Sequence, residues 1–285
     1  MIKELAQFCS DEFAQKAIEC KRSYQCDQCL KEIHYDKNSV RRYDCAYMCY
    51  WYVCKNIYRY STEMVWLFHN NGLKLQERTK PIIIWSIGCG PCSELIAFEE
   101  YYAKKQCSFD YSYIGFDQND IWKPIQEKIK QLSANSHNIE FYSEDVFEYY
   151  KRTQTAPNVI ILNYMLSDML KYNPENFQSF LTNLYDFLSH LPSFALLIND
   201  INSGRDSTAP RFYFASIITE IRELFDKDKI CAWAYHFKDS KKRYFEYGAP
   251  RDNNTLLFKI DENIINNFSP NTECHSAQLC IIKYR

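Results

Sequence analysis

Apolar positions follow two different patterns along the chain. Before residue 80 they recur mainly at helical spacing, and they predict helices over residues 3–20 and 40–69. The second of these helices is aromatic at many positions, so we expect much of its surface to be buried and Gly72 to mark its end. From Pro81 onward, short apolar runs alternate with helical stretches, a pattern typical of a parallel sheet with helices on both faces.

The second part of the chain supplies all of the predicted strands. Seven apolar runs predict them, at residues 82–87, 111–116, 139–143, 158–162, 194–199, 230–237 and 278–284. The predicted helices between them span residues 94–105, 120–133, 146–152, 176–188 and 212–225. We therefore expect an α/β protein with a helical, Cys- and Tyr-rich cap over residues 1–78 and a sheet domain over residues 79–285. Residues 238–276 are expected to form an irregular hairpin or lid.

Charge and composition exclude several classes of protein. The 34 basic and 36 acidic residues nearly cancel, which argues against a generally basic nucleic-acid binder but leaves a local basic patch open. The apolar runs all fall short of the roughly 18–20 residues that span a bilayer, and the N-terminus lacks the core of a signal peptide. We therefore expect a cytoplasmic protein whose 13 cysteines are mostly reduced thiols.

The most informative motif is IIIWSIGCGPCSEL at residues 82–95, where a predicted strand leads through a short loop into a predicted helix. The loop residues are Gly88, Cys89, Gly90 and Pro91. Its two glycines permit a sharp turn and let the backbone approach a ligand without side-chain obstruction. A dinucleotide fingerprint requires a third glycine, and Ser93 stands at that position instead.

This Gly-Cys-Gly-Pro loop resembles the first motif of the class I S-adenosylmethionine (SAM)-dependent methyltransferases, with Cys92 replacing the last glycine of the longer form. The resemblance extends from residue 82 to about residue 237 and includes the final strand. It implies SAM as the cofactor and a Rossmann-like sheet whose last strand is antiparallel. It also implies a set of cofactor-binding residues: Gly88, Cys89, Gly90, Pro91, Asp117, Gln118, Asp145, Val146 and Asn163.

Polar residues end four successive strands, at the edge where α/β sheets bind ligands. Asp117 ends the second strand and is expected to accept hydrogen bonds from ribose hydroxyls. Asp145 follows the third and is expected either to contact the adenine amino group or to cap a helix. Asp200, after the fifth strand, is expected either to touch substrate or to cap a loop.

Asn163 and Tyr164 end the fourth strand, where the resemblance places the methyl group, so they are the candidate catalytic residues. The Pro-Pro that follows Asn or Asp in adenine and amide N-methyltransferases is missing here, so that particular chemistry is not supported. The sequence shows no compelling general base, and His236 is the one histidine worth testing.

Other functions compete for the same residues. Cys89-Gly90-Pro91-Cys92 also fits a thioredoxin-like redox motif. An NAD-dependent oxidoreductase is a second alternative, and a non-catalytic sensor or partner subunit that binds SAM or S-adenosylhomocysteine (SAH) is a third. For a methyltransferase, the near-neutral charge favours a small-molecule or protein acceptor, and nucleic acid is not excluded.

Seven of the 13 cysteines precede residue 80. Cys26 and Cys29 have metal-like spacing, and Cys45 and Cys49 share one face of the predicted long helix, so a four-cysteine zinc site is conceivable. Buried thiols are the favoured interpretation because Cys45 and Cys49 lie in an aromatic stripe, and we assign no metal ligands. We expect the tyrosines of that stripe to pack against the sheet domain, with one or two reaching over the cofactor.

Overall fold

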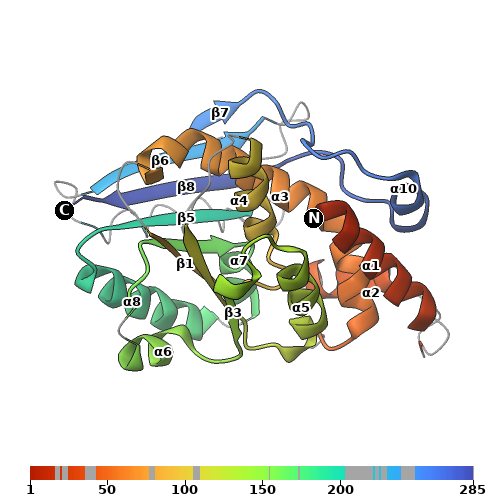
Figure 1. The fold of residues 1–285 in the computed structure, drawn as a ribbon, viewed down its shortest axis with the longest axis horizontal. Coiled ribbons are helices and arrows are strands. Elements are labelled where there is room, and N and C mark those ends of the chain that lie inside the picture. The colour runs from red at the N-terminus through yellow and green to blue at the C-terminus, as the bar shows by residue number, and fades with distance from the viewer. Residues whose placement is uncertain are drawn as a thin grey trace.

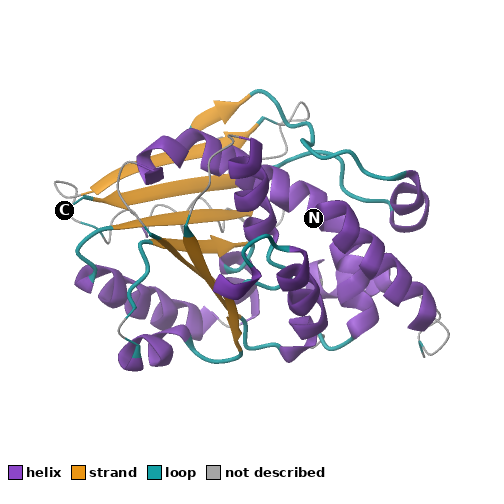
Figure 2. Ribbon diagram, viewed as in Figure 1, coloured by secondary structure: helices purple, strands orange, loops and turns teal. Residues whose placement is uncertain are grey.

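The computed structural model describes residues 1–16, 20, 25–35, 43–76, 81–104, 110–153, 155–172, 174–202, 221, 225, 230–238 and 248–284. In these parts of the chain, one mixed sheet is flanked by helices (Figure 2). The N-terminal helices α1 and α2 stand to the right of the sheet in Figure 1, and α6 and α8 lie below it at the left.

The bounds of the elements are as follows. The strands are β1 (Ile82–Ile87), β2 (Tyr111–Phe116), β3 (Ile139–Tyr142), β4 (Val159–Asn163), β5 (Phe194–Ile201), β6 (Ile230–Phe237), β7 (Ala249–Arg251) and β8 (Ser276–Lys283). The helices are α1 (Ile2–Lys16), α2 (Cys26–Tyr35), α3 (Ala46–Gln76), α4 (Ser93–Lys104), α5 (Lys123–Leu132), α6 (Val146–Arg152), α7 (Leu166–Tyr172), α8 (Pro174–His190) and α10 (Glu262–Phe268). The 3-10 turns are η2 (Asp120–Trp122) and η3 (Ser136–Asn138).

The sheet has the strand order β3-β2-β1-β4-β5-β8-β6-β7. β1 to β5 are mutually parallel, and β8 inserts antiparallel between β5 and β6. This confirms the predicted α/β class, the mostly parallel sheet and the antiparallel last strand. The prediction of seven strands was one short, because residues 249–251 pair in parallel with β6. The carboxyl ends of β1, β2, β4 and β5 consequently share one edge of the sheet.

Two hydrophobic cores cover the two faces of the sheet, because successive side chains of a strand point to opposite faces. In β1, Ile84 belongs to the core beneath α3 and α4, whereas its neighbour Trp85 belongs to the core beneath α6 and α8. Both side chains are fully buried. A strand buried on both faces must be apolar at nearly every position, which is why these strands appear as continuous apolar runs.

The long helix α3 departs from its predicted bounds at both ends. It begins at Ala46 and continues past Gly72, which was expected to end it. A helix-interior glycine costs only about 1 kcal/mol, and packing of α3 on α1, α4 and β5 offsets such a cost. Tyr50 and Tyr58 are buried in the same core as the sheet, as expected for a packing stripe.

Three short helices, α2, α7 and α10, were not predicted, and the helix predicted at residues 212–225 lies outside the described residues apart from Ile221 and Phe225. The division of the chain at residue 78 stays a prediction. Among the described helices, none combines the length and the apolar character that crossing a membrane requires.

Candidate functional site

The loop between β1 and α4 has three residues in the left-handed region: Gly88 at φ +66°, Gly90 at +46° and Cys92 at +52°. A Cβ on Gly88 would come within 2.5 Å of Met165 Cγ, so this glycine is required by packing. A Cβ on Gly90 would instead point between Trp122 and Asp117, 3.8 and 3.9 Å from their nearest atoms. Cys92 keeps the left-handed conformation at the position where the longer motif has glycine.

Asp117 at the end of β2 is brought directly to this loop. Its Oδ2 accepts a hydrogen bond of 2.8 Å from the Gly90 N–H, and its Oδ1 accepts one of 2.9 Å from the Asn119 N–H. Burial raises the pKa of the carboxyl group. Each carboxylate oxygen has capacity for a further donor, which suits a ligand that carries a pair of hydroxyls. Gln118 beside it is exposed.

Asp145 is the N-cap of α6. Its Oδ1 accepts hydrogen bonds from the N–H groups of Phe147 and Glu148, at 2.8 and 3.1 Å. Val146 next to it is buried, whereas the Asp145 side chain is exposed. The capping interpretation of Asp145 is therefore confirmed, and the adenine contact stays a prediction. Asp200 caps a helix, α7, and not only a loop as predicted: its Oδ2 accepts from the Ser167 N–H at 3.0 Å, in the first turn of α7. Its contact with substrate stays a prediction.

At the ends of β4 and β5, a buried chain of amides links two acidic side chains. Asn163 Nδ2 donates to Ser93 Oγ at 2.7 Å and to Glu94 Oε2 at 3.3 Å, and its Oδ1 accepts from Asn199 Nδ2 at 2.9 Å. Asn199 Nδ2 also donates to Glu63 Oε2 at 3.3 Å. Both functions of the Asn163 amide are thus engaged within the protein, so its predicted catalytic role stays a prediction.

The buried acid at the α4 end of this chain is Glu94. Its Oε1 accepts hydrogen bonds from Ser86 Oγ at 2.6 Å and from Tyr113 OH at 2.7 Å. Burial raises the pKa of Glu94. These contacts tie the first turn of α4 to β1 and β2 directly behind the glycine loop, and so fix the loop's geometry.

The acid at the other end is Glu63, from the middle of α3. Its side chain is fully buried, and Oε2 accepts a hydrogen bond of 2.8 Å from Tyr164 OH. Oε1 accepts one of 3.0 Å from the His275 N–H. Burial raises the pKa of Glu63. This residue was not predicted, because the sequence marks it only as a lone acid within a helix expected to be buried.

Tyr164 combines a left-handed backbone, φ +55°, with a stacked ring. Its ring is stacked on that of Tyr60, with centroids 3.8 Å apart and an interplanar angle of 24°. Tyr52 continues the series, 6.0 Å from Tyr60 and 5.7 Å from Trp122. Tyr43 completes it, 5.5 Å from Trp122. This aromatic row follows the carboxyl edge from the β2 side to β4.

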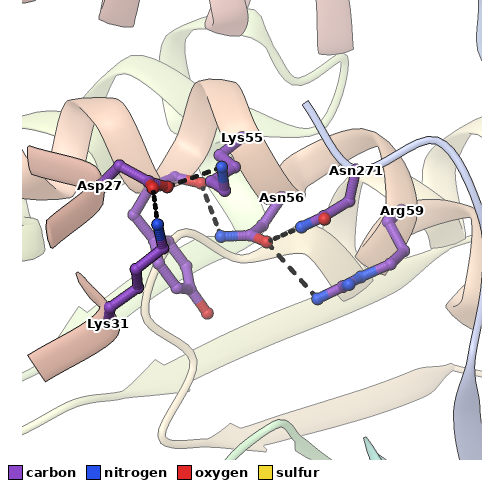
Figure 3. Close-up of polar contacts among 7 residues, drawn as sticks. Asp27, Lys31, Lys55, Asn56, Arg59 and Asn271 are labelled. Carbon is purple, nitrogen blue, oxygen red and sulfur yellow. Dashed lines mark hydrogen bonds and ion pairs between the residues drawn. The ribbon is translucent and has the colours of Figure 1, made fainter. Parts of the chain in front are cut away.

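Arg59 lies one helical turn before Glu63 and is buried. Its guanidinium is 4.7 Å from the Tyr60 ring centroid, and Nη1 is 3.0 Å from His275 Nε2. Its Nη2 donates to Asn56 Oδ1 at 3.4 Å, and the Asn271 amide donates to the same oxygen at 2.7 Å (Figure 3). Arg59 is therefore held in place beside the carboxyl edge, and its charge favours the ionised form of Glu63.

The cysteines of the loop do not suit redox chemistry. Cys89 and Cys92 are buried, and burial raises the pKa of both thiols. A reactive cysteine needs a thiolate, which a lowered pKa and partial exposure provide. Elsewhere in the described part of the chain, no group of three or more His, Cys, Asp or Glu side chains is arranged to hold a metal ion. Cys26, Cys29 and Cys49 are buried in the helical N-terminal part.

The sequence matches no known family profile, and no curated protein matches it. The chain is similar to the solved structure of the plantazolicin methyltransferase BpumL in complex with SAH, with 15% identity, coverage of 100% of this chain and 98% of that one, and a TM-score of 0.45. It is also similar to a SAM-dependent methyltransferase from Aquifex aeolicus (12% identity, coverage of 79% and 93%, TM-score 0.42). An rRNA methylase from Streptococcus thermophilus is a third similar structure (12% identity, coverage of 76% and 95%, TM-score 0.39).

Proposed function

We propose that this protein is a SAM-dependent methyltransferase. The observation that carries the proposal is the contact between Gly90 and Asp117 at the carboxyl edge of a Rossmann-like sheet. The Gly90 N–H donates a hydrogen bond of 2.8 Å to the Asp117 carboxylate, and Gly90 has no side chain to block a ligand there. The space that a Cβ on Gly90 would enter is bordered by Trp122 and Asp117. A nucleoside fits this combination, with its ribose hydroxyls on the Asp117 oxygens.

The remaining predicted contacts complete the proposed cofactor site. The turn from Gly88 to Pro91 would pass close to the bound molecule because its glycines present no side chains. Gln118, Asp145 and Val146 follow β2 and β3 on the same edge and are the proposed neighbours of the ribose and the adenine. SAM, when bound, supplies a methyl group on a sulfonium centre.

The protein's own contribution to the chemistry is position and exclusion of water. Tyr164 lies at the end of β4, next to the strand that carries the glycine loop, and its stacked ring is fixed by Tyr60. The aromatic row provides apolar surface along the edge where donor and acceptor would meet. We propose a small-molecule or protein acceptor on the basis of the near-neutral charge, with 34 basic and 36 acidic residues.

Calorimetric titration of the purified protein with SAM, SAH and NAD tests the cofactor. We expect saturable binding of SAM and SAH, and at least a ten-fold loss of SAM affinity in Asp117→Ala, equal to about 1.4 kcal/mol. Asp186→Ala is the matched control, because Asp186 is an exposed acid on α8. Binding of NAD in preference to SAM, or no binding of either adenosyl compound, would contradict the proposal.

Turnover separates an enzyme from a sensor that binds SAM without reacting. Tritiated methyl-SAM, incubated with pools of amines, phenols, peptides and RNA, should label one class of acceptor. Tyr164→Phe and Asn163→Ala should then lose rate, with SAM affinity less affected. If no pool is labelled while SAM binds tightly, the sensor function is favoured.

A further inference from the structure

Glu63 has the contacts of an ionised carboxylate. The three groups hydrogen-bonded to its two oxygens, namely Tyr164 OH, Asn199 Nδ2 and the His275 N–H, all serve as donors. A protonated carboxyl group would instead need an acceptor for its own O–H. The Arg59 charge one turn away favours the same ionised state.

The direction of these hydrogen bonds is fixed by the surrounding side chains. Asn199 could present either its oxygen or its nitrogen to Glu63 if its amide were free to flip. Its Oδ1 accepts from Ser276 Oγ at 2.6 Å and from Gln278 Nε2 at 2.8 Å, however, and this leaves Nδ2 toward Glu63. The Gln278 amide nitrogen also donates to the backbone oxygen of Glu63 at 2.7 Å, so its own orientation is set.

Tyr164 consequently donates its only hydroxyl proton to Glu63. Its phenol oxygen keeps its lone pairs for a further donor. The left-handed backbone of Tyr164 and the stack on Tyr60 hold this oxygen at the end of β4. A phenol that donates to a buried carboxylate and can accept from a third group is arranged to pass a proton between them.

We propose that Tyr164 and Glu63 form a proton relay that serves the methyl acceptor, and that the acceptor therefore carries an N–H or O–H at the atom that is methylated. The proposal rests on the proposed methyltransferase function. As the acceptor atom forms its bond to the methyl carbon, the methyl–sulfur bond breaks and its electron pair stays on sulfur. The acceptor's proton moves to the phenol oxygen while the phenol proton moves to Glu63 Oε2. Tyr164 is the catalytic residue, and Glu63 acts through it.

This relay provides the base that the sequence did not reveal. Glu63 belongs to the helical N-terminal part, and Tyr164 belongs to the sheet, 101 residues later. Because burial raises the pKa of Glu63, the carboxylate holds a proton more readily than an exposed one does.

The first test needs neither acceptor nor cofactor. Tyrosines labelled with ¹³C at Cζ are followed by NMR from about pH 8 down to about pH 4, and Tyr164→Phe identifies the resonance of Tyr164. In the wild type we expect that resonance to show a titration step centred above pH 4.5, the ordinary glutamate value, as Glu63 gains its proton. In Glu63→Gln the step should vanish. A step that persists in Glu63→Gln, or a Tyr164 resonance that does not titrate in the wild type, would overturn the proposal.

The second test uses the acceptor class found in the turnover screen. We expect Glu63→Gln and Tyr164→Phe each to lower kcat by roughly 10²–10⁴-fold with SAM affinity within about three-fold of wild type. The acid limb of the wild-type kcat profile should disappear in Glu63→Gln. Glu148→Gln and Tyr185→Phe are matched exposed controls with wild-type rates. Wild-type kcat in Glu63→Gln, or an acid limb that it retains, would exclude the relay.

The two proposals fail in different ways. If the wild type does not bind SAM, the methyltransferase function and the relay are both ruled out, whatever the NMR titration shows. If SAM binds and the acceptor is methylated but Tyr164 is uncoupled from Glu63, only the relay falls. Tyr164→Phe keeps the ring and its stack, so it reports on the relay even if Glu63→Gln does not fold.

Discussion

Asn163 and Asn199 lie side by side near the carboxyl ends of two neighbouring parallel strands, and the Asn199 amide nitrogen donates a hydrogen bond of 2.9 Å to the Asn163 amide oxygen. This pair joins Glu94 on α4 to Glu63 on α3 through an unbroken set of hydrogen bonds. The edge of the sheet that carries the candidate site is therefore held by buried polar contacts as well as by apolar packing.

Replacing Asn199 with Ala should destabilise the protein strongly. The change removes partners from Glu63, Ser276 and Gln278, and each buried polar group left unsatisfied costs about 1–3 kcal/mol. We expect the free energy of unfolding in urea to fall by about 3 kcal/mol or more. Asn267→Ala, at an exposed site, should change it by less than about 0.5 kcal/mol. Equal stabilities of the two variants would show that the network contributes nothing.

Gly88→Ala and Gly90→Ala should differ although both residues have positive φ. Each substitution costs roughly 1 kcal/mol in the backbone, but only the Cβ on Gly88 would clash with a side chain, because Met165 Cγ lies 2.5 Å from it. We expect Gly88→Ala to be the less stable of the two in thermal unfolding. Gly90→Ala should stay folded and lose SAM binding, because its Cβ enters the space beside Asp117 and Trp122. Unimpaired SAM binding by Gly90→Ala would place the cofactor elsewhere.

Asp200 should make stability depend on pH. Burial raises the pKa of Asp200 to about 6 from an ordinary value of 3.8. The folded state therefore binds the proton more tightly, and the free energy of unfolding falls as pH rises through this window, by up to about 3 kcal/mol. Asp200→Asn should lack this component when urea unfolding is compared at pH 4 and pH 7. A wild type that gains stability relative to Asp200→Asn over this range would reverse the sign and refute the prediction.

Asp145 provides a test of the adenine contact. Ser at an N-cap serves about as well as Asp, whereas Ala costs about 1 kcal/mol. We expect Asp145→Ser to keep its stability and to lose SAM affinity in calorimetry, and Asp145→Ala to lose both. If Asp145→Ser binds SAM as tightly as the wild type, capping of α6 is the only role of this side chain.

Cys89 and Cys92 should react slowly with iodoacetamide in the native protein at pH 8. Burial raises the pKa of both thiols, so little thiolate forms, and it also keeps the reagent away from the sulfur atoms. Mass spectrometry should find the half-buried Cys20, Cys45 and Cys231 alkylated before these two. Rapid alkylation of Cys89 or Cys92 would show a reactive thiol and would support the redox function.

The strands of the sheet and the position of the glycine loop could both be predicted from local sequence patterns. A strand covered on both faces needs apolar residues at successive positions, as Ile84 and Trp85 illustrate, and a sharp turn needs glycine, as at Gly88. These requirements are local, so a single segment displays them. The end of α3 was mispredicted because Gly72 gives a local stop signal that packing of the helix overrides.

The contacts between polar side chains could not be predicted in this way, because they depend on how the whole chain packs. Glu63 and Tyr164 are separated by 101 residues, and Asn199 and Ser276 by 77. No local pattern marks such pairs, because a hydrogen bond between distant segments depends on how the whole chain packs α3 across the sheet edge. The residues that could bind a ligand were visible in the sequence at Gly90 and Asp117. The buried acid that could accept a proton, Glu63, is identifiable only from the tertiary structure, because packing places α3 beside the end of β4.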